Sequence, residues 1–193
     1  MVFKPKDIIS IAKKIELGHI GIFPFDTLIG LTGILSETSI NKVIHIKKRD
    51  SSPFIILIPN LTFLPKLVDS ISTYQKNIIS NYWPGPFTFI FKKNKSVSDF
   101  VTSSKPTIAI RFANFLPLNF LLSELNQPIF STSVNLHGHS AATTFNRIHE
   151  DILAQSDFLY SEIMPRYNDC STIVDISNDS STILRQGIGI FND

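Results

Sequence analysis

Apolar positions recur along this chain with two periods, one typical of helices and one typical of strands. Apolar side chains three or four positions apart predict helices, and alternation or short apolar runs predict strands. The expected helices cover residues 6–17, 38–48, 72–82, 115–125 and 146–154. The expected strands cover residues 19–25, 54–58, 86–93, 107–112, 127–133, 157–162, 171–177 and 181–187.

The order of these elements indicates the fold class. Helices and strands alternate in the first part of the chain, whereas adjacent strands close it, with a polar turn at residues 178–180 that suggests a hairpin. This order predicts an α/β fold with a mixed sheet rather than a purely parallel one. No repeat or linker interrupts the pattern, so we expect a single domain over residues 1–193.

Composition narrows the class of protein. The 193 residues are 43% hydrophobic and 18% charged, which is typical of a globular domain with a substantial core. The net charge of +2 is too small to predict a duplex-binding surface. Cys170, the single cysteine, excludes an internal disulfide. Neither a signal peptide nor an apolar segment of the roughly 20 residues that a membrane span needs is present, so we expect a soluble, cytoplasmic protein.

Several familiar catalytic motifs are missing from the sequence. It contains no phosphate-binding P-loop, dinucleotide fingerprint or H-E-x-x-H helix. His137-Gly138-His139 lacks a carboxylate or cysteine at ligand spacing, so a loop is favoured over a metal site. For Cys170, which has no obvious base beside it, a core thiol is favoured over a nucleophile. We therefore expect no metal site made of protein side chains.

Polar residues gather instead where predicted strands end. Asp26-Thr27, Arg111, residues 131–135 and Arg185 each follow or end a strand, and the cations of residues 47–49 precede one. In open α/β sheets, ligands bind outside the carboxyl ends of strands. These residues are therefore the candidates for a binding site.

The three cations Lys47, Lys48 and Arg49 allow two interpretations. At the end of a helix they would offset the helix dipole and extend into water. Alternatively, Lys47 and Arg49 hold an anion together, which requires the helix to have unwound, because residues two apart do not share a helix face. Residues 50–53, Asp-Ser-Ser-Pro, favour such a break.

A set of short motifs resembles the YrdC-like domain family of threonylcarbamoyl-AMP synthases, which begin threonylcarbamoyladenosine formation in tRNA. The resemblance extends over about residues 8–190, and seven motifs occur in the family's order. They are Pro24-Phe25-Asp26-Thr27-Leu28-Ile29-Gly30-Leu31, Lys47-Lys48-Arg49, Trp83-Pro84-Gly85-Pro86-Phe87-Thr88, Ile110-Arg111-Phe112-Ala113, Ser133-Val134-Asn135, Ser171-Thr172-Ile173-Val174-Asp175 and Arg185-Gln186-Gly187.

The resemblance implies a twisted mixed sheet with flanking helices around a large, positively charged cavity. It also implies that L-threonine, bicarbonate and ATP are joined into threonylcarbamoyl-AMP with release of pyrophosphate. ATP is then a substrate, with Mg²⁺ bridging its phosphates. The product would pass to downstream threonylcarbamoyl-transferase proteins. Lys92, Lys93 and Lys95 favour an exposed strand end, with a tRNA contact as the alternative.

The same resemblance implies roles for individual residues. Those expected at ATP are Lys47, Arg49, Ser52, Thr107, Ser133, Asn135, Ala141 and Arg185. Those expected at threonine are Thr27, Arg111, Ser131 and Ser171. Lys47, Arg49, Ser133 and Asn135 are expected to act as the catalytic residues. Trp83 is expected to be a core aromatic at a turn rather than a platform for a base.

The sequence departs from the family pattern at three positions. Phe25 replaces a threonine and Ile29 replaces an aromatic residue, which affects the expected threonine pocket. Ser52 stands in a loop one residue shorter than usual, where a polar or cationic residue is common. Two alternative functions therefore remain open: an RNA-binding or ribosome-associated module without catalysis, and a related carbamoyl-group transferase.

Overall fold

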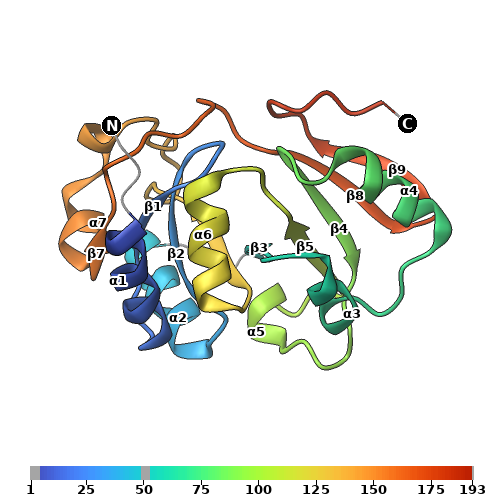
Figure 1. Cartoon of the computed structure of the whole chain (residues 1–193), viewed down its shortest axis with the longest axis horizontal. Helices are drawn as coiled ribbons and strands as arrows, with labels where there is room; N and C mark the ends of the chain where they lie inside the picture. The colour runs from blue at the N-terminus through green and yellow to red at the C-terminus, as the bar shows by residue number, and fades with distance from the viewer. Residues whose placement is uncertain (1–4, 49–52, 193) are drawn as a thin grey trace.

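The computed structural model describes residues 5–48 and 53–192 (Figure 1). Its α-helices are α1 (Pro5–Glu16), α2 (Glu37–Lys47), α3 (Leu64–Leu67), α4 (Thr73–Tyr82), α5 (Asp99–Thr102), α6 (Leu116–Leu125) and α7 (Glu150–Gln155). Two 3₁₀ turns are η1 (Leu61–Phe63) and η2 (Phe145–Arg147). None of the helices in these described ranges has the length and apolar character needed to cross a membrane.

The described strands form one mixed sheet. They are β1 (Gly21–Pro24), β2 (Ile29–Ile34), β3 (Ile55–Leu57), β4 (Phe87–Lys92), β5 (Thr107–Arg111), β6 (Ile129–Ser133), β7 (Phe158–Leu159), β8 (Thr172–Asn178) and β9 (Ser180–Arg185). Their spatial order is β7-β1-β2-β6-β3-β5-β4-β8-β9. Three pairs are parallel (β1 with β7, β3 with β5, β4 with β8) and the other neighbours are antiparallel. The predicted mixed α/β sheet is confirmed; the assignment of the whole chain to one domain stays a prediction.

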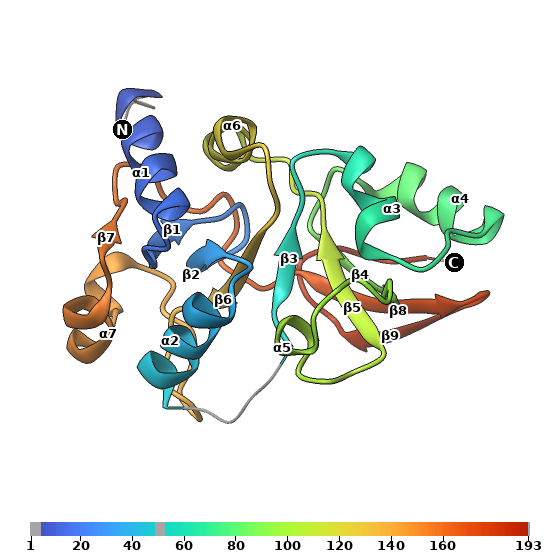
Figure 2. The same cartoon turned by 90° about the horizontal axis from the view of Figure 1, so that it is seen from below.

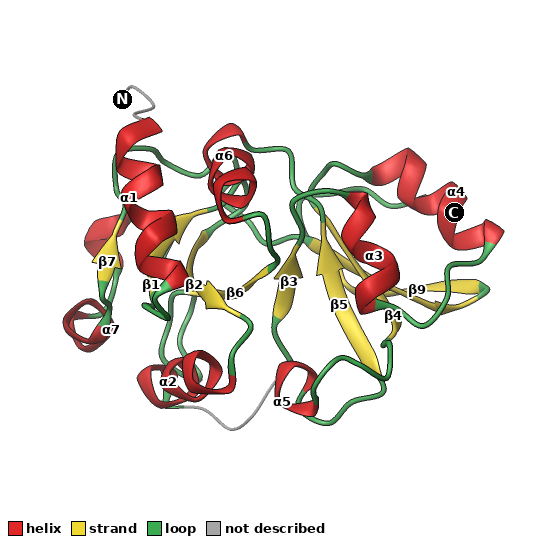
Figure 3. Ribbon diagram, turned by 60° about the horizontal axis from the view of Figure 1, so that its bottom comes forward, coloured by secondary structure: helices red, strands yellow, loops and turns green. Residues whose placement is uncertain are grey.

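Two apolar cores lie on opposite faces of the sheet. Helices α1 and α6 pack side by side and cover Phe23, Leu57 and Ile129 on one face. On the other face, helix α2 packs against Ile56 and Phe130. Apolar residues of α4 belong to the same core. Figure 3 shows α1 and α6 above β1, β2 and β6, with α2 below them. Figure 2 shows the same separation of α6 from α2 in another view.

Local sequence signals explain where two helices begin and end. Helix α1 ends just before Gly18, which has a φ of 84° and closes the last turn by donating its N–H to the Ile15 carbonyl. Helix α4 begins with a capping box. The Ser72 side chain accepts from the Gln75 N–H, and the Gln75 side chain accepts from the Ser72 N–H.

The structure corrects two sequence-based expectations. Strand β2 was not predicted, because its sequence, Ile-Gly-Leu-Thr-Gly-Ile, is neither a continuous apolar run nor a regular alternation of apolar and polar residues. The expected helix over 146–154 is confirmed only in its second half, by α7, and the 3₁₀ turn η2 stands in place of its start. Ile148, between them, has an extended backbone (ψ 132°), which interrupts the helical path.

Candidate functional site

One face of the central strands carries polar side chains from separate parts of the chain. Ser131 on β6 pairs with Ile55 on β3, which pairs with Ala109 on β5. Successive side chains of a strand point to opposite faces. Ser133 and Arg111, each two residues further along its strand, therefore share this face with Ser131.

A pocket of about 260 Å³ opens on this face. Its wall is built from the turn after β1, the end of β5, strand β6, the start of β8 and the end of β9. The sequence-predicted residues that line it are Thr27, Arg111, Ser131, Ser133, Ser171 and Arg185. The pocket therefore brings together all four residues expected at threonine and two of those expected at ATP.

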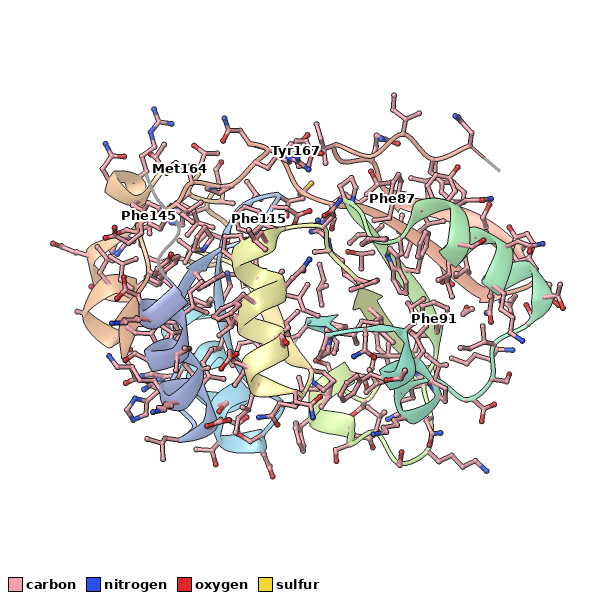
Figure 4. All side chains as sticks on the ribbon, viewed as in Figure 1. Phe87, Phe91, Phe115, Phe145, Met164 and Tyr167 are labelled. Carbon is pink, nitrogen blue, oxygen red and sulfur yellow. The ribbon has the colours of Figure 1, made fainter. Side chains whose placement is uncertain are left out.

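Asp26 and Thr27 form the tip of the hairpin between β1 and β2. The Phe25 N–H donates to the Leu28 carbonyl at 3.0 Å, which closes the turn around these two buried residues. The turn is also held by the segment that crosses from β7 to β8, since the Tyr167 N–H donates to the Asp26 carbonyl at 2.7 Å. Figure 4 labels Tyr167 on this crossing segment.

Arg111 joins this turn to the end of β5 through a buried ion pair. Its Nη2 donates to Asp26 Oδ2 at 2.5 Å, its Nη1 donates to Thr27 Oγ1 at 2.9 Å, and its Nε faces the Gly85 carbonyl at 3.4 Å. The side chains of Arg111 and Asp26 are 4% and 2% exposed. Because burial disfavours both charges, it raises the pKa of Asp26 and lowers the pKa of Arg111, while their mutual attraction opposes both shifts.

Lys47 is turned inward at the end of α2. The helix stops there because Lys48 takes the left-handed conformation, with a φ of 49°. The Lys47 side chain is buried, and its Nζ donates to the Ser133 carbonyl and, at 2.8 Å, to Asn135 Oδ1. Lys48 lies at the surface, where its Nζ is 2.9 Å from Asp151 Oδ2. Lys48 therefore matches the first interpretation, a cation at a helix end that extends to the surface. The joint role of Lys47 and Arg49 at an anion stays a prediction, because Arg49 lies outside the described residues.

Asn135 connects Lys47 to the pocket wall. Its Oδ1 accepts from Ser133 Oγ at 2.6 Å as well as from Lys47. Its Nδ2 donates to the carbonyls of Leu136 and His139, at 3.1 and 2.8 Å. Asn135 thus fixes both the loop after β6 and the polar groups at the end of β6.

Ser171 supports Arg185 at the other side of the pocket. Arg185 donates to the Ser171 carbonyl from Nε at 3.1 Å and from Nη2 at 2.9 Å, and Nη2 also lies 3.1 Å from Ser171 Oγ. Ser171 Oγ is 2.8 Å from Thr88 Oγ1, and both hydroxyl-bearing residues are buried. Arg185 itself is exposed, so its positive charge is held at the pocket while remaining open to solvent.

Comparison with known proteins assigns the chain to a family. The Sua5/YciO/YrdC family model, described as "Telomere recombination", matches residues 13–187. The chain belongs to the Sua5/YciO/YrdC family. A threonylcarbamoyl-AMP synthase of Vibrio vulnificus (strain YJ016) is 30% identical over 183 residues, covering 92% of this chain and 97% of the relative.

Solved structures of Sua5/YciO/YrdC proteins have the same fold. P. abyssi Sua5 complexed with L-threonine superimposes with a TM-score of 0.90 at 25% identity, over 97% of this chain. This chain spans 56% of that Sua5 chain. E. coli YciO superimposes with a TM-score of 0.86 at 21% identity, covering 97% of this chain and 92% of YciO.

Two other predicted ligand residues of this Sua5/YciO/YrdC chain, Thr107 and Ala141, lie elsewhere. Thr107 is half-buried at the start of β5, four residues from Arg111 on the same face, and does not line the pocket. Ala141, also half-buried, lies in the loop after β6 outside the pocket wall. Arg49 and Ser52 lie outside the described residues, so their assignments stay predictions.

The structure adds contacts that the family motifs did not indicate. Cys170 is half-buried and lines the pocket, so the expectation of a core thiol is wrong. Burial raises the pKa of this thiol, with Arg185 opposing the shift.

Trp83 is a core aromatic as predicted: it is 7% exposed, packs on Phe89 and donates its Nε1–H to the Phe87 carbonyl at 2.8 Å.

The charges of the site favour anionic ligands. The pocket wall contains two guanidinium groups, Arg111 and Arg185, and the hydroxyls of Thr27, Ser131 and Ser133. These groups can bind carboxylate and phosphate oxygens. Among the described residues, no three His, Cys, Asp or Glu side chains gather in a way that could hold a metal ion.

Proposed function

We propose that the chain is a threonylcarbamoyl-AMP synthase that uses L-threonine, bicarbonate and ATP and releases pyrophosphate. The observation that carries the proposal is one pocket in which Thr27, Arg111 and Ser131 lie close to Ser133 and Arg185. The name of the Vibrio vulnificus relative and the L-threonine bound by P. abyssi Sua5 support this assignment.

The proposed reaction needs positioning and charge neutralisation more than a strong base. Bicarbonate dehydrates to CO₂, which the threonine amine takes up with loss of a proton, so that the carbamate forms with net release of one water. A carbamate oxygen then attacks the α-phosphorus of ATP, and the bond to the β-phosphate oxygen breaks to release pyrophosphate. Both reactants are anions, so cationic side chains must offset their mutual repulsion.

The roles of individual residues follow from their places in the pocket. Thr27, Arg111 and Ser131 hold threonine, with its carboxylate near Thr27 and Arg111. Arg185 and Ser133 contact the nucleotide, and Lys47 reaches its phosphates from behind Ser133. Arg49, Ser52, Thr107, Asn135, Ala141 and Ser171 complete the proposed ligand set. Mg²⁺ would neutralise the phosphates without dedicated protein ligands.

The altered positions Phe25 and Ile29 belong to the same pocket wall. Phe25 and Ile55 provide apolar surface beside Thr27 and Ser131, suited to the methyl group of threonine, whereas the Ile29 side chain is buried in the core on the other face of the sheet. We place the reaction in the cytoplasm, where its product would serve tRNA modification through a downstream transferase.

An omission series tests this function. Purified chain is given ATP, L-threonine and bicarbonate with Mg²⁺, and pyrophosphate release is measured with each component left out in turn. Release that requires all three substrates supports the proposal, and release indifferent to threonine contradicts it. Activity with carbamoyl phosphate in place of threonine would identify a carbamoyl transferase instead. RNA binding without any adenylate formation would identify a non-catalytic module.

A further inference from the structure

A buried chain of polar contacts leads from Asp26 through Arg111 to Thr27. The Asp26 carboxylate binds one arm of the guanidinium at 2.5 Å, and the other arm donates to the Thr27 hydroxyl at 2.9 Å. Thr27 and Arg111 line the pocket, whereas Asp26 is 2% exposed and does not. Asp26 is therefore too deep to contact a ligand, although it binds a residue that does.

The direction of these hydrogen bonds determines what Thr27 offers to a ligand. A guanidinium group can only donate, so Thr27 Oγ1 must be the acceptor of the bond from Arg111. A threonine hydroxyl has one proton, which cannot point toward the Arg111 donor. Because Thr27 lines the pocket, its hydroxyl proton can turn toward a ligand there, where it matches an acceptor such as a carboxylate oxygen.

Backbone hydrogen bonds close the turn in which Asp26 lies, from Phe25 to Leu28 and from Tyr167 to Asp26. The backbone N–H groups of Asp26 and Thr27 also stabilise the Asp26 carboxylate, after the attraction of Arg111. The side-chain hydrogen bond of the carboxylate is made by Oδ2, with Arg111, while Oδ1 is buried without a hydrogen-bond partner in the described part of the chain. Burying a charged carboxylate costs free energy unless the group is paired. Here the pairing partner is Arg111.

We propose that Asp26 is a positioning residue: it holds the Arg111 guanidinium so that Thr27 presents its hydroxyl proton to the carboxylate of the amino-acid substrate. Asp26 acts through Arg111 and Thr27 and does not touch the substrate. The inference rests on the proposed function, because it assigns the amino-acid carboxylate to this side of the pocket.

A double-mutant cycle on the full chain tests the inference. The KM values for threonine and ATP are measured by pyrophosphate release for the wild type, Asp26→Asn, Thr27→Val and the double variant. Loss of a hydrogen bond to a charged group predicts a threonine KM about tenfold higher in each single variant, with the ATP KM unchanged. Because both residues act on one contact, the double variant should be little worse than Thr27→Val alone.

Three controls separate positioning from a general structural role. Thr27→Ser keeps the hydroxyl and should keep the threonine KM of the wild type. Asp157→Asn removes a carboxylate from another ion pair, with Lys42, outside the pocket, and should leave both KM values unchanged. If Asp26→Asn does not fold, Asp26→Glu, which keeps the charge but displaces it, should raise the threonine KM selectively.

Two results would overturn the inference: additive effects of Asp26→Asn and Thr27→Val, or a parallel change of both KM values. Failure of the proposed function is distinguishable, because the wild type would then release no pyrophosphate in response to threonine. Binding of L-threonine to the same variants, measured by calorimetry without ATP, would then decide the inference. Binding that is equal in wild type and Asp26→Asn would overturn it.

Discussion

Lys47 and Lys48 are neighbours in the sequence, yet their ammonium groups bind on different sides of α2. Lys47 Nζ lies 2.8 Å from Asn135 Oδ1, beside the pocket wall, whereas Lys48 Nζ lies 2.9 Å from Asp151 Oδ2 at the surface. The left-handed backbone of Lys48 ends the helix and separates the two side chains. One short cationic run therefore contains both an inward group and a solvated one.

This pair gives a matched test of the proposed ATP site. We expect Lys47→Ala to lower kcat/KM for ATP by about 100-fold or more, as removal of a charge-stabilising donor does in other active sites. Lys48→Ala should change it by less than about twofold, since an exposed ion pair contributes little. Pyrophosphate release measured over a range of ATP concentrations checks both. Equal losses in the two variants would contradict the assignment of Lys47.

The ion pair of Asp157 with Lys42 predicts a pH-dependent contribution to stability. Asp157 accepts from Lys42 Nζ at 2.6 Å and from the Ile20 N–H at 2.7 Å. Burial raises the pKa of Asp157, but the two donors lower it by more than burial raises it. The pKa therefore lies below the ordinary value of 3.8. The ionised form is therefore favoured by folding. Its contribution is present above pH 3.8 and is lost as the pH falls through the folded-state pKa.

The variant Asp157→Asn measures this contribution. At neutral pH it should lower the free energy of unfolding by about 0.2–1 kcal/mol, the range for a solvent-exposed ion pair. The difference from the wild type should shrink as the pH falls from 3.8 through the lowered folded-state pKa of Asp157, because the wild-type carboxyl is then protonated too. Urea unfolding of the wild type and the variant, measured at neutral pH and at an acidic pH below 3.8, checks this prediction. A difference that stays constant with pH would show that the loss does not come from the charge.

Periodicity and short apolar runs predicted most of the fold, because the helices are amphipathic and buried strands such as β1 are apolar runs. Strand β2 has neither pattern, and Gly30 within it is explained only by the tertiary structure. A Cβ at Gly30 would clash with the Phe25 ring and approach the Thr132 carbonyl. Such close approach between strands leaves no periodic signal in the sequence.

The family motifs predicted which residues gather at the pocket, but not how they bind one another. Motif order placed Thr27, Arg111 and Arg185 in one site, and the structure brings them together. The same motifs assigned Thr107 and Ala141 to the ATP site, but these two residues do not line the pocket. Hydrogen-bond direction depends on side-chain geometry, so the link from Asp26 to Thr27 could not be inferred from spacing.

The contacts of Ser171 could not be inferred from its motif either. They predict that substitution of Ser171 changes the KM for ATP rather than the KM for threonine. Its hydroxyl lies 3.1 Å from Arg185 Nη2 and 2.8 Å from Thr88 Oγ1. In Ser171→Ala the backbone carbonyl of residue 171 still accepts from Arg185. We therefore expect a modest rise in the ATP KM, about threefold to tenfold, because only one of the three hydrogen bonds from Arg185 to Ser171 is lost, with the threonine KM unchanged. Steady-state kinetics check this prediction. A selective rise in the threonine KM would contradict it and would favour the expected role of Ser171 at threonine.

Cys170 provides a chemical probe of the pocket because it is the single cysteine of the chain. It is half-buried in the pocket wall, and burial raises the pKa of its thiol above the ordinary value of 9.0. The thiolate is the reactive form, so alkylation by iodoacetamide should be slow at neutral pH and accelerate as the pH rises past 9.0.

Bound ATP should protect Cys170 from this reagent, because the proposed nucleotide contacts Arg185 and Ser133 share the pocket wall with the thiol. Modification is followed by the mass of the intact chain and by the loss of pyrophosphate release. Cys170→Ser should resist modification and remain active under the same treatment. Alkylation at the same rate with and without ATP would mean that the nucleotide does not occupy this pocket, because a ligand bound there would block access to the sulfur.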